Sequence, residues 1–106
     1  MRAFAGLKRR DEFARLRQSG GRQGTAHFTI FRAAAGPAQT RPVAGITVSG
    51  RIGGAVVRNR LRRRIAGALQ ELLAGSPPCR LLVVPRPDAA QLPYALIVAE
   101  LRRALP

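Results

Sequence analysis

The segment from Ala55 to Ala74 constrains the fold of this chain more than any other part of the sequence. Its apolar residues recur at the three- and four-residue spacing of one α-helical face. They are Val57, Leu61, Ile65, Ala68, Leu69 and Leu72. A β-branched segment, residues 43–48, precedes this helix, and the wholly apolar residues 81–84 follow it beyond a glycine and two prolines. Because a helix can connect two parallel strands, the pattern predicts a parallel strand pair bridged by the helix.

The other segments add helices and strands to this unit. They predict an extended arm over residues 1–10, a helix that begins at Asp11, a strand over residues 25–32 and a final helix over residues 94–105. The short loop between the first two strands predicts that they form an antiparallel pair. The order is therefore α-β-β-α-β-α, with an extra short strand near Arg22 as the alternative. We expect an α+β fold, a two-layer α/β sandwich in a single domain spanning residues 1–106.

The charge of the chain is strongly one-sided. The chain has nineteen Lys and Arg residues but only five Asp and Glu residues, which gives a net charge of +14 over 106 residues. All but one of the basic residues are arginines. The guanidinium group forms a planar fork that fits phosphate and also stacks on bases, so the composition suits RNA at least as well as DNA.

The predicted long helix carries the densest part of this charge. Five arginines lie within residues 58–64, and no acidic residue precedes Glu71 on the helix. The repulsion between these arginines cannot be relieved by pairs with acids one turn away. Phosphate groups would relieve it, whereas the alternative is a solvated charged face. On the helix, Asn59 and Arg63 point away from the core, and Arg58 lies at the core edge.

Several kinds of catalytic or metal site are disfavoured by composition. No acidic residue occurs between Phe13 and Gln70, so carboxylates cannot easily converge on one hydrolytic site. Cys79 and His27 are the only residues of their types, which excludes an intrachain disulfide and a zinc site built from thiolates. His27 falls in an alternating strand pattern and is expected to face solvent. We therefore expect no catalytic residue and no metal site in the protein, and a self-contained nuclease is disfavoured.

No apolar stretch approaches the roughly 20 residues needed to cross a bilayer, so no membrane association is expected. A lone cysteine fits a reducing cytoplasm. Binding to DNA through a helix-turn-helix is also disfavoured, because a glycine-rich loop and a strand precede the arginine-rich helix in place of a short scaffold helix.

The sequence around this helix resembles a known family. The residues Gly50-Arg51-Ile52-Gly53-Gly54-Ala55-Val56-Val57-Arg58-Asn59-Arg60-Leu61-Arg62-Arg63 are similar to the signature of the bacterial ribonuclease P protein component. Further similar segments cover nearly the whole chain in the right order: residues 7–9 with 11–13, residues 28–31, residues 43–49 and residues 81–86.

The resemblance implies a ribosomal-protein-like topology and an accessory role in an RNA-catalysed endonuclease. The family's protein binds a large catalytic RNA, and the complex removes the 5′ leader from precursor tRNA. Magnesium ions serve the RNA, and the protein alone is expected to be inactive. By position, the residues that would contact the catalytic RNA are Arg51, Arg58, Asn59, Arg60, Arg62 and Arg63. Those that would hold the leader in a cleft between the first helix and the sheet are Phe13, Arg17 and Phe31.

The chain departs from the family pattern at three positions. Gly50 replaces a basic residue, and Gly54 replaces a polar residue that would cap the long helix. Arg17 stands where the cleft often has an aromatic residue, which affects the leader bases that would be preferred. Filling of the core is the alternative role for Phe13 and Phe31. The alternative function for the chain is a ribosomal-protein-like RNA-binding domain without a processing role.

Overall fold

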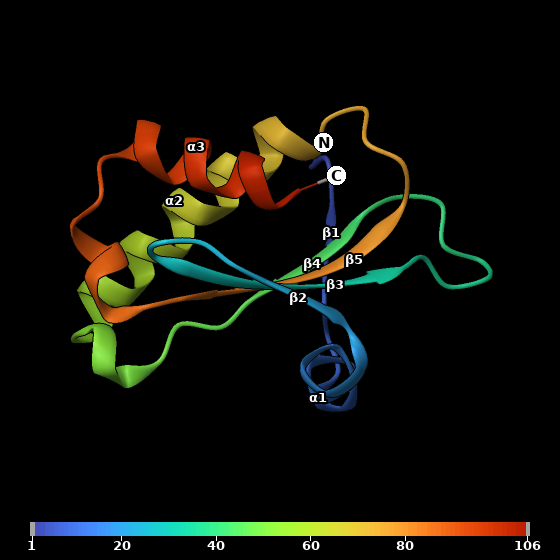
Figure 1. Cartoon of the computed structure of the whole chain (residues 1–106), viewed down its shortest axis with the longest axis horizontal. Coiled ribbons are helices and arrows are strands. Elements are labelled where there is room, and N and C mark those ends of the chain that lie inside the picture. Colours follow the sequence, from blue (N-terminus) through green and yellow to red (C-terminus); the bar gives the residue numbers. More distant parts are fainter. Residues whose placement is uncertain (1, 106) are drawn as a thin grey trace.

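A computed structural model describes residues 2–105 of the chain (Figure 1). Its elements are β1 (Ala5–Gly6), α1 (Arg10–Ser19), β2 (Gly21–Gly24), β3 (Phe28–Ala34), β4 (Val43–Ile46), the short 3₁₀ helix η1 (Gly50–Ile52), α2 (Ala55–Leu73), β5 (Cys79–Pro85), the 3₁₀ helix η2 (Pro87–Gln91) and α3 (Tyr94–Ala104). The five strands form one sheet in the order β1-β4-β5-β3-β2. This arrangement confirms the predicted α+β class.

The parallel strand pair bridged by the long helix is confirmed. Strands β4 and β5 run parallel, with Val43 opposite Arg80 and Ile46 opposite Val83, and α2 connects them. The predicted pairing of β3 with β4 is wrong, because β5 lies between them and pairs antiparallel with β3. The three residues from Leu81 to Val83 have no exposed surface, so β5 is buried on both faces and takes the centre of the sheet.

Two short strands form the edges of the sheet. Strand β2 pairs antiparallel with β3, which confirms the extra strand near Arg22. Strand β1 pairs parallel with β4, so the N-terminal arm is extended as predicted but also contributes a strand. The side chain of Phe4 is 2% exposed and belongs to the core. The arm is therefore anchored to the domain.

Helices α2 and α3 cover one face of the sheet, and α1 lies on the other (Figure 1). The main core lies under α2 and α3. It includes Phe28, Ile30, Leu81 and Val83 from the sheet and Leu61, Ile65, Leu69, Ile97 and Leu101 from the helices. Leu16 of α1 and Leu82 of β5 are buried outside this cluster. The two-layer sandwich thus carries α1 as a partial layer on its opposite face.

The core face of α2 follows the predicted spacing except at its two ends. Leu61, Ile65, Ala68 and Leu69 are buried, whereas Val57 is 41% exposed. Leu73 is buried at the far end, where Leu72 is only partly buried. Val57 lies against the loop before the helix, since a Cβ built on Gly53 would lie 3.1 Å from the Val57 side chain. The first turn of α2 is therefore partly open to solvent.

The prediction for His27 is wrong. His27 precedes β3 in a turn, in which the Thr25 amide donates a hydrogen bond to the Phe28 carbonyl oxygen (2.8 Å). Its Nδ1 lies 2.6 Å from Glu100 Oε2 on α3, and its backbone N–H donates to Glu100 Oε1 (2.9 Å). Only 27% of the imidazole side chain is exposed. The carboxylate of a distant helix holds the ring, which strand alternation could not reveal.

The hydrogen bonds at Glu100 determine its protonation. Burial alone would raise the pKa of this carboxyl group, but hydrogen bonds from His27 and Thr25 outweigh the burial and lower the pKa below its usual value of 4.5. Glu100 therefore links α3 to the turn before β3 as a carboxylate.

Candidate nucleic-acid interface

The basic residues of α2 differ in how firmly they are held. Asn59, Arg60 and Arg63 are exposed, as the helical spacing predicts. Arg58 is partly buried, and its Nε donates a hydrogen bond to the Gly53 carbonyl oxygen (3.2 Å). Arg62 is also partly buried and donates to Asn59 Oδ1 (2.9 Å). Arg58 is thus fixed at the core edge, while Arg60 and Arg63 extend into solvent.

The charge of this surface is not neutralised by any ion pair within the part of the chain that the structure describes. Across residues 2–105, the carboxylates that form ion pairs are those of Asp11, Asp88 and Glu100, and their partners are Arg9, Arg15 and His27. None of these partners belongs to α2. The five arginines of the helix therefore present uncompensated positive charge to an incoming polyanion.

The loop before α2 extends this surface. Arg51 of η1 is exposed, and Gly54 occupies the N-cap position without a side-chain hydrogen bond. The first turn of α2 contains no acidic residue. The structure thus brings together all six residues proposed by resemblance to contact the catalytic RNA, on the loop and the first three turns of one helix.

A hollow of about 410 Å³ continues along α2 from this surface. Its walls are Arg63, Ala66, Gly67 and Gln70 of the helix and Arg2 of the N-terminal arm. The arm is held there by a hydrogen bond from the Ala3 amide to Gln70 Oε1 (2.7 Å). Arg2 therefore adds a positive charge to the α2 surface. The sequence alone did not indicate that the N-terminal arm lies beside this helix.

The residues proposed for the leader lie on the face of the sheet that carries α1. Phe31 of β3 is opposite Leu82 of β5 in register, so their side chains share this face. Gly45 of β4 is also opposite Leu82, and the ring of Phe13 from α1 lies directly over Gly45. Phe13 and Phe31 are both partly buried, and Arg17 is exposed on the last turn of α1. The three residues thus share one face.

The same register places a further residue in this row. Arg22 of β2 is opposite Phe31 and is exposed. A row across four strands therefore runs from Gly45 through Leu82 and Phe31 to Arg22. Sequence reasoning missed Arg22 as a site residue, because its relation to Phe31 depends on strand register. The signal available was the alternative short strand near Arg22.

Phe13 also connects the two surfaces. It lines a hollow of about 210 Å³ at the β1 edge of the sheet, whose other walls include Leu7, Gly45 and Arg62. Phe31 and Arg17 do not line this hollow. The α1 face and the α2 surface therefore meet at the N-terminal arm, where Phe13 of α1 and Arg62 of α2 line the same hollow.

Two further features concern the described residues alone. Among residues 2–105, no group of three or more His, Cys, Asp and Glu side chains is arranged to hold a metal ion. None of the helices in this range combines the length and the apolar character required to cross a membrane.

The fold and these surfaces define a small basic α+β domain with an arginine-rich crossover helix. The family model for ribonuclease P matches residues 1–106. The chain is 33% identical over 100 residues to the ribonuclease P protein component of Acidothermus cellulolyticus, covering 93% of this chain and 83% of that protein. It is also 41% identical over 99 residues to the ribonuclease P protein component of Thermus scotoductus. This match covers 93% of the chain but only 57% of the relative's length. The chain belongs to the ribonuclease P protein family.

Solved structures share the fold. The ribonuclease P protein of Staphylococcus aureus superposes with a TM-score of 0.83 at 21% identity, covering 92% of this chain and 89% of that one. The protein from Thermotoga maritima gives a TM-score of 0.82 at 19% identity and covers 93% of each chain. These likenesses extend over the sheet and helices that position both surfaces.

Proposed function

We propose that this chain is the protein subunit of ribonuclease P and assists endonucleolytic removal of the 5′ leader from precursor tRNA. The observation that carries the proposal is the uncompensated arginine surface of α2 in a chain of this family. The alternative of a ribosomal-type domain without a processing role is not favoured, because the relatives and solved structures described above are ribonuclease P proteins.

The α2 surface would bind the catalytic RNA. Arg60 and Arg63 are exposed and have no carboxylate partner within residues 2–105, so each can contact a phosphate without breaking an ion pair there. Arg58 and Arg62 are held by hydrogen bonds within α2 and its preceding loop, which limits the conformational entropy lost on binding. Asn59 and Arg51 would complete this contact surface.

The α1 face would bind the single-stranded leader. Phe13 and Phe31 each present a partly exposed ring on which a base can stack. Arg17 and Arg22 lie on the same side of the sheet and would hold backbone phosphates. Because arginine can stack on a base or bind a phosphate, Arg17 would make leader binding tolerant of base identity.

Chemistry would remain with the RNA and its magnesium ions, in the cytoplasm, and the protein would act by binding and orienting. The test is reconstitution with a bacterial ribonuclease P RNA and a precursor tRNA at limiting magnesium. We expect leader removal to be faster with the protein than without it, and we expect nuclease-treated protein alone to leave the precursor intact. Cleavage by RNA-free protein, or no effect of the protein on the RNA reaction, would overturn the proposal.

A further inference from the structure

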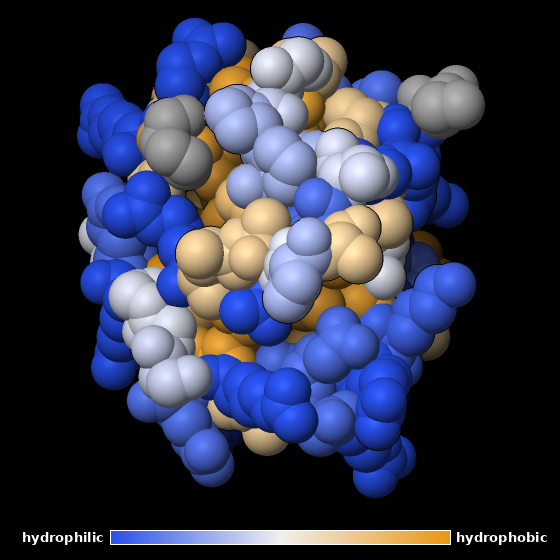
Figure 2. All heavy atoms as spheres, turned by 90° about the vertical axis from the view of Figure 1, so that its right-hand side faces the viewer, coloured by the Kyte–Doolittle hydropathy of each residue, from blue (hydrophilic) through white to orange (hydrophobic). Residues whose placement is uncertain are grey.

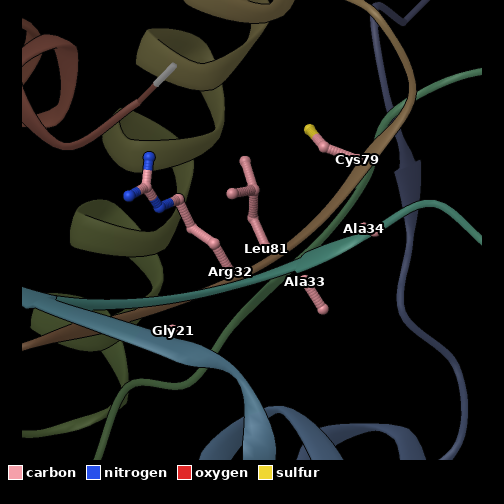
Figure 3. Close-up of a pocket in the computed structure, with 6 residues that line it drawn as sticks. All are labelled: Gly21, Arg32, Ala33, Ala34, Cys79 and Leu81. Carbon is pink, nitrogen blue, oxygen red and sulfur yellow. The ribbon is translucent and has the colours of Figure 1, made fainter.

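A pocket outside both surfaces lies where β3 extends past the beginning of β2. Strand β2 begins at Gly21, opposite Arg32, so Ala33 and Ala34 have no partner on that side. The pocket has a volume of about 320 Å³ and opens to solvent. It is lined by Gly21, Arg32, Ala33, Ala34, Cys79 and Leu81 (Figure 3). Its volume falls at the lower end of the range of about 300–1,000 Å³ that is usual for small-molecule sites.

One wall of the pocket carries a guanidinium group that has no partner among residues 2–105. Arg32 is partly buried and has no hydrogen bond or ion pair with any residue between 2 and 105. Two other arginines on or just after β5 are held by the backbone: Arg80 Nε donates to the Ala34 carbonyl oxygen (2.8 Å), and Arg86 donates to the Thr25 carbonyl oxygen (2.6 Å). A partly buried charge without a partner is costly, so an anion at Arg32 would be stabilising.

The rest of the pocket is apolar. The side chains of Arg32, Leu81 and Cys79 project from the sheet toward the side of α2 and α3 (Figure 3). Leu81 is fully buried, and the two alanines add no polar side-chain atom. At the end of the sheet where β3 ends and β5 begins, apolar surface shows between strongly hydrophilic residues (Figure 2). The pocket therefore fits a ligand with an anionic group joined to a flat, weakly polar body.

We propose that this pocket binds one nucleotide of a single-stranded RNA, with its phosphate on the Arg32 guanidinium and its base against Cys79 and Ala34. The net charge of +14 favours a nucleic acid over other anions, and a nucleotide combines the two chemistries that the walls offer. The site is distinct from the α1 face, because Arg32 and Phe31 are consecutive strand residues and project to opposite faces. This inference rests on the proposed function only because RNA is the ligand in both.

The thiol of Cys79 provides a direct measurement, because it is the only cysteine of the chain. The probe is adenosine monophosphate, and the readout is the rate at which iodoacetamide alkylates the free protein at physiological ionic strength. We expect adenosine monophosphate to slow alkylation several-fold and uncharged adenosine to protect much less. Absence of protection by adenosine monophosphate would overturn the proposal.

Variants identify the phosphate contact. In Arg32→Ala, protection by adenosine monophosphate should be lost, and Arg32→Lys should retain part of it. Arg10→Ala is the matched control, since it removes one exposed charge on α1, across the sheet, and should keep full protection. Burial raises the pKa of the Cys79 thiol, and the positive charge of Arg32 opposes this effect. Each variant is therefore judged by the ratio of its rates with and without nucleotide. Equal protection in Arg32→Ala and the wild type would contradict the assignment.

A second measurement does not depend on any variant folding. Amide chemical shifts of the wild-type protein, followed during titration with adenosine monophosphate, should move at Ala33, Ala34 and Leu81. Shifts confined to α2 would overturn the pocket and leave the proposed RNA surface intact. Because neither experiment uses the catalytic RNA, failure of the pocket and failure of the processing function are separate results.

Discussion

The ring of Phe13 lies so close over Gly45 that a Cβ built there would be 2.7 Å from Phe13 Cε1 and 2.7 Å from Leu7 Cδ1. Glycine at this position of β4 lets α1 and the N-terminal arm approach the sheet. The contact sets the position of an aromatic ring that we assign to the leader surface. It therefore links the packing of α1 to RNA binding.

Gly45→Ala tests this link. The added methyl group must displace Phe13 and Leu7, so we expect the free energy of unfolding to fall by about 1–3 kcal/mol, measured by urea denaturation. Gly6→Ala is the matched control, because a Cβ at Gly6 would have no atom within 4 Å. Equal stability of the two variants would show that Phe13 is not closely packed on β4.

The exposed and anchored arginines of α2 should respond differently to truncation. Arg60→Ala and Arg63→Ala each remove a phosphate contact, so the slope of log affinity against log salt should become shallower by about 0.7–0.9 per lost phosphate. Their free energies of unfolding should change by less than about 0.5 kcal/mol. Arg58→Ala should weaken RNA binding and also lose about 0.5–1.5 kcal/mol of stability, because its hydrogen bond to Gly53 is removed. Filter binding over a salt series and urea denaturation measure the two effects, and a fully stable Arg58→Ala would contradict the second.

The lowered pKa of Glu100 predicts that the stability of the fold depends on pH. Its pKa is lower in the folded protein than its usual value of 4.5, so the unfolded state binds the proton more readily. The stabilisation is therefore complete above about pH 4.5 and is lost as the pH falls through the lower folded value. Thermal unfolding of the wild type should show this loss, and Glu100→Gln should reduce it. Glu12→Gln, on α1, should keep the wild-type pH dependence, and a similar change in both variants would contradict this role of Glu100.

Local patterns in the sequence were sufficient for the central unit of the fold. The helical spacing from Leu61 to Leu69 and the apolar run from Leu81 to Val84 each report burial directly, so α2 and β5 could be predicted. The position of β5 between β3 and β4 could not be predicted from local patterns. The short loop between β3 and β4 favours pairing of these two strands, but β5 takes the place between them, where both of its faces are buried. The link between His27 and Glu100 spans 73 residues and has no local signal.

The candidate site divides in the same way. The five arginines of α2 lie within seven residues of one helix, so their common surface follows from helical spacing. The α1 face combines Phe13, Phe31 and Arg22 from three elements. The family resemblance predicted that Phe13 and Phe31 share a cleft, whereas only the register of β2 with β3 adds Arg22. Arg32 was not singled out by the sequence, because only the structure shows that it has no partner among residues 2–105, whereas Arg80 and Arg86 are held by backbone carbonyl oxygens.

The central claim is that one protein has two RNA surfaces, one for the catalytic RNA and one for the leader. The most direct measurement is the affinity of the reconstituted enzyme for precursor tRNA relative to mature tRNA, together with the affinity of the protein for the catalytic RNA. Phe31→Ala should lose the preference for the precursor and bind the catalytic RNA normally, because only the precursor offers a leader. Arg60→Ala should weaken binding to the catalytic RNA and keep the preference. The same defect of both variants in both assays would contradict the account.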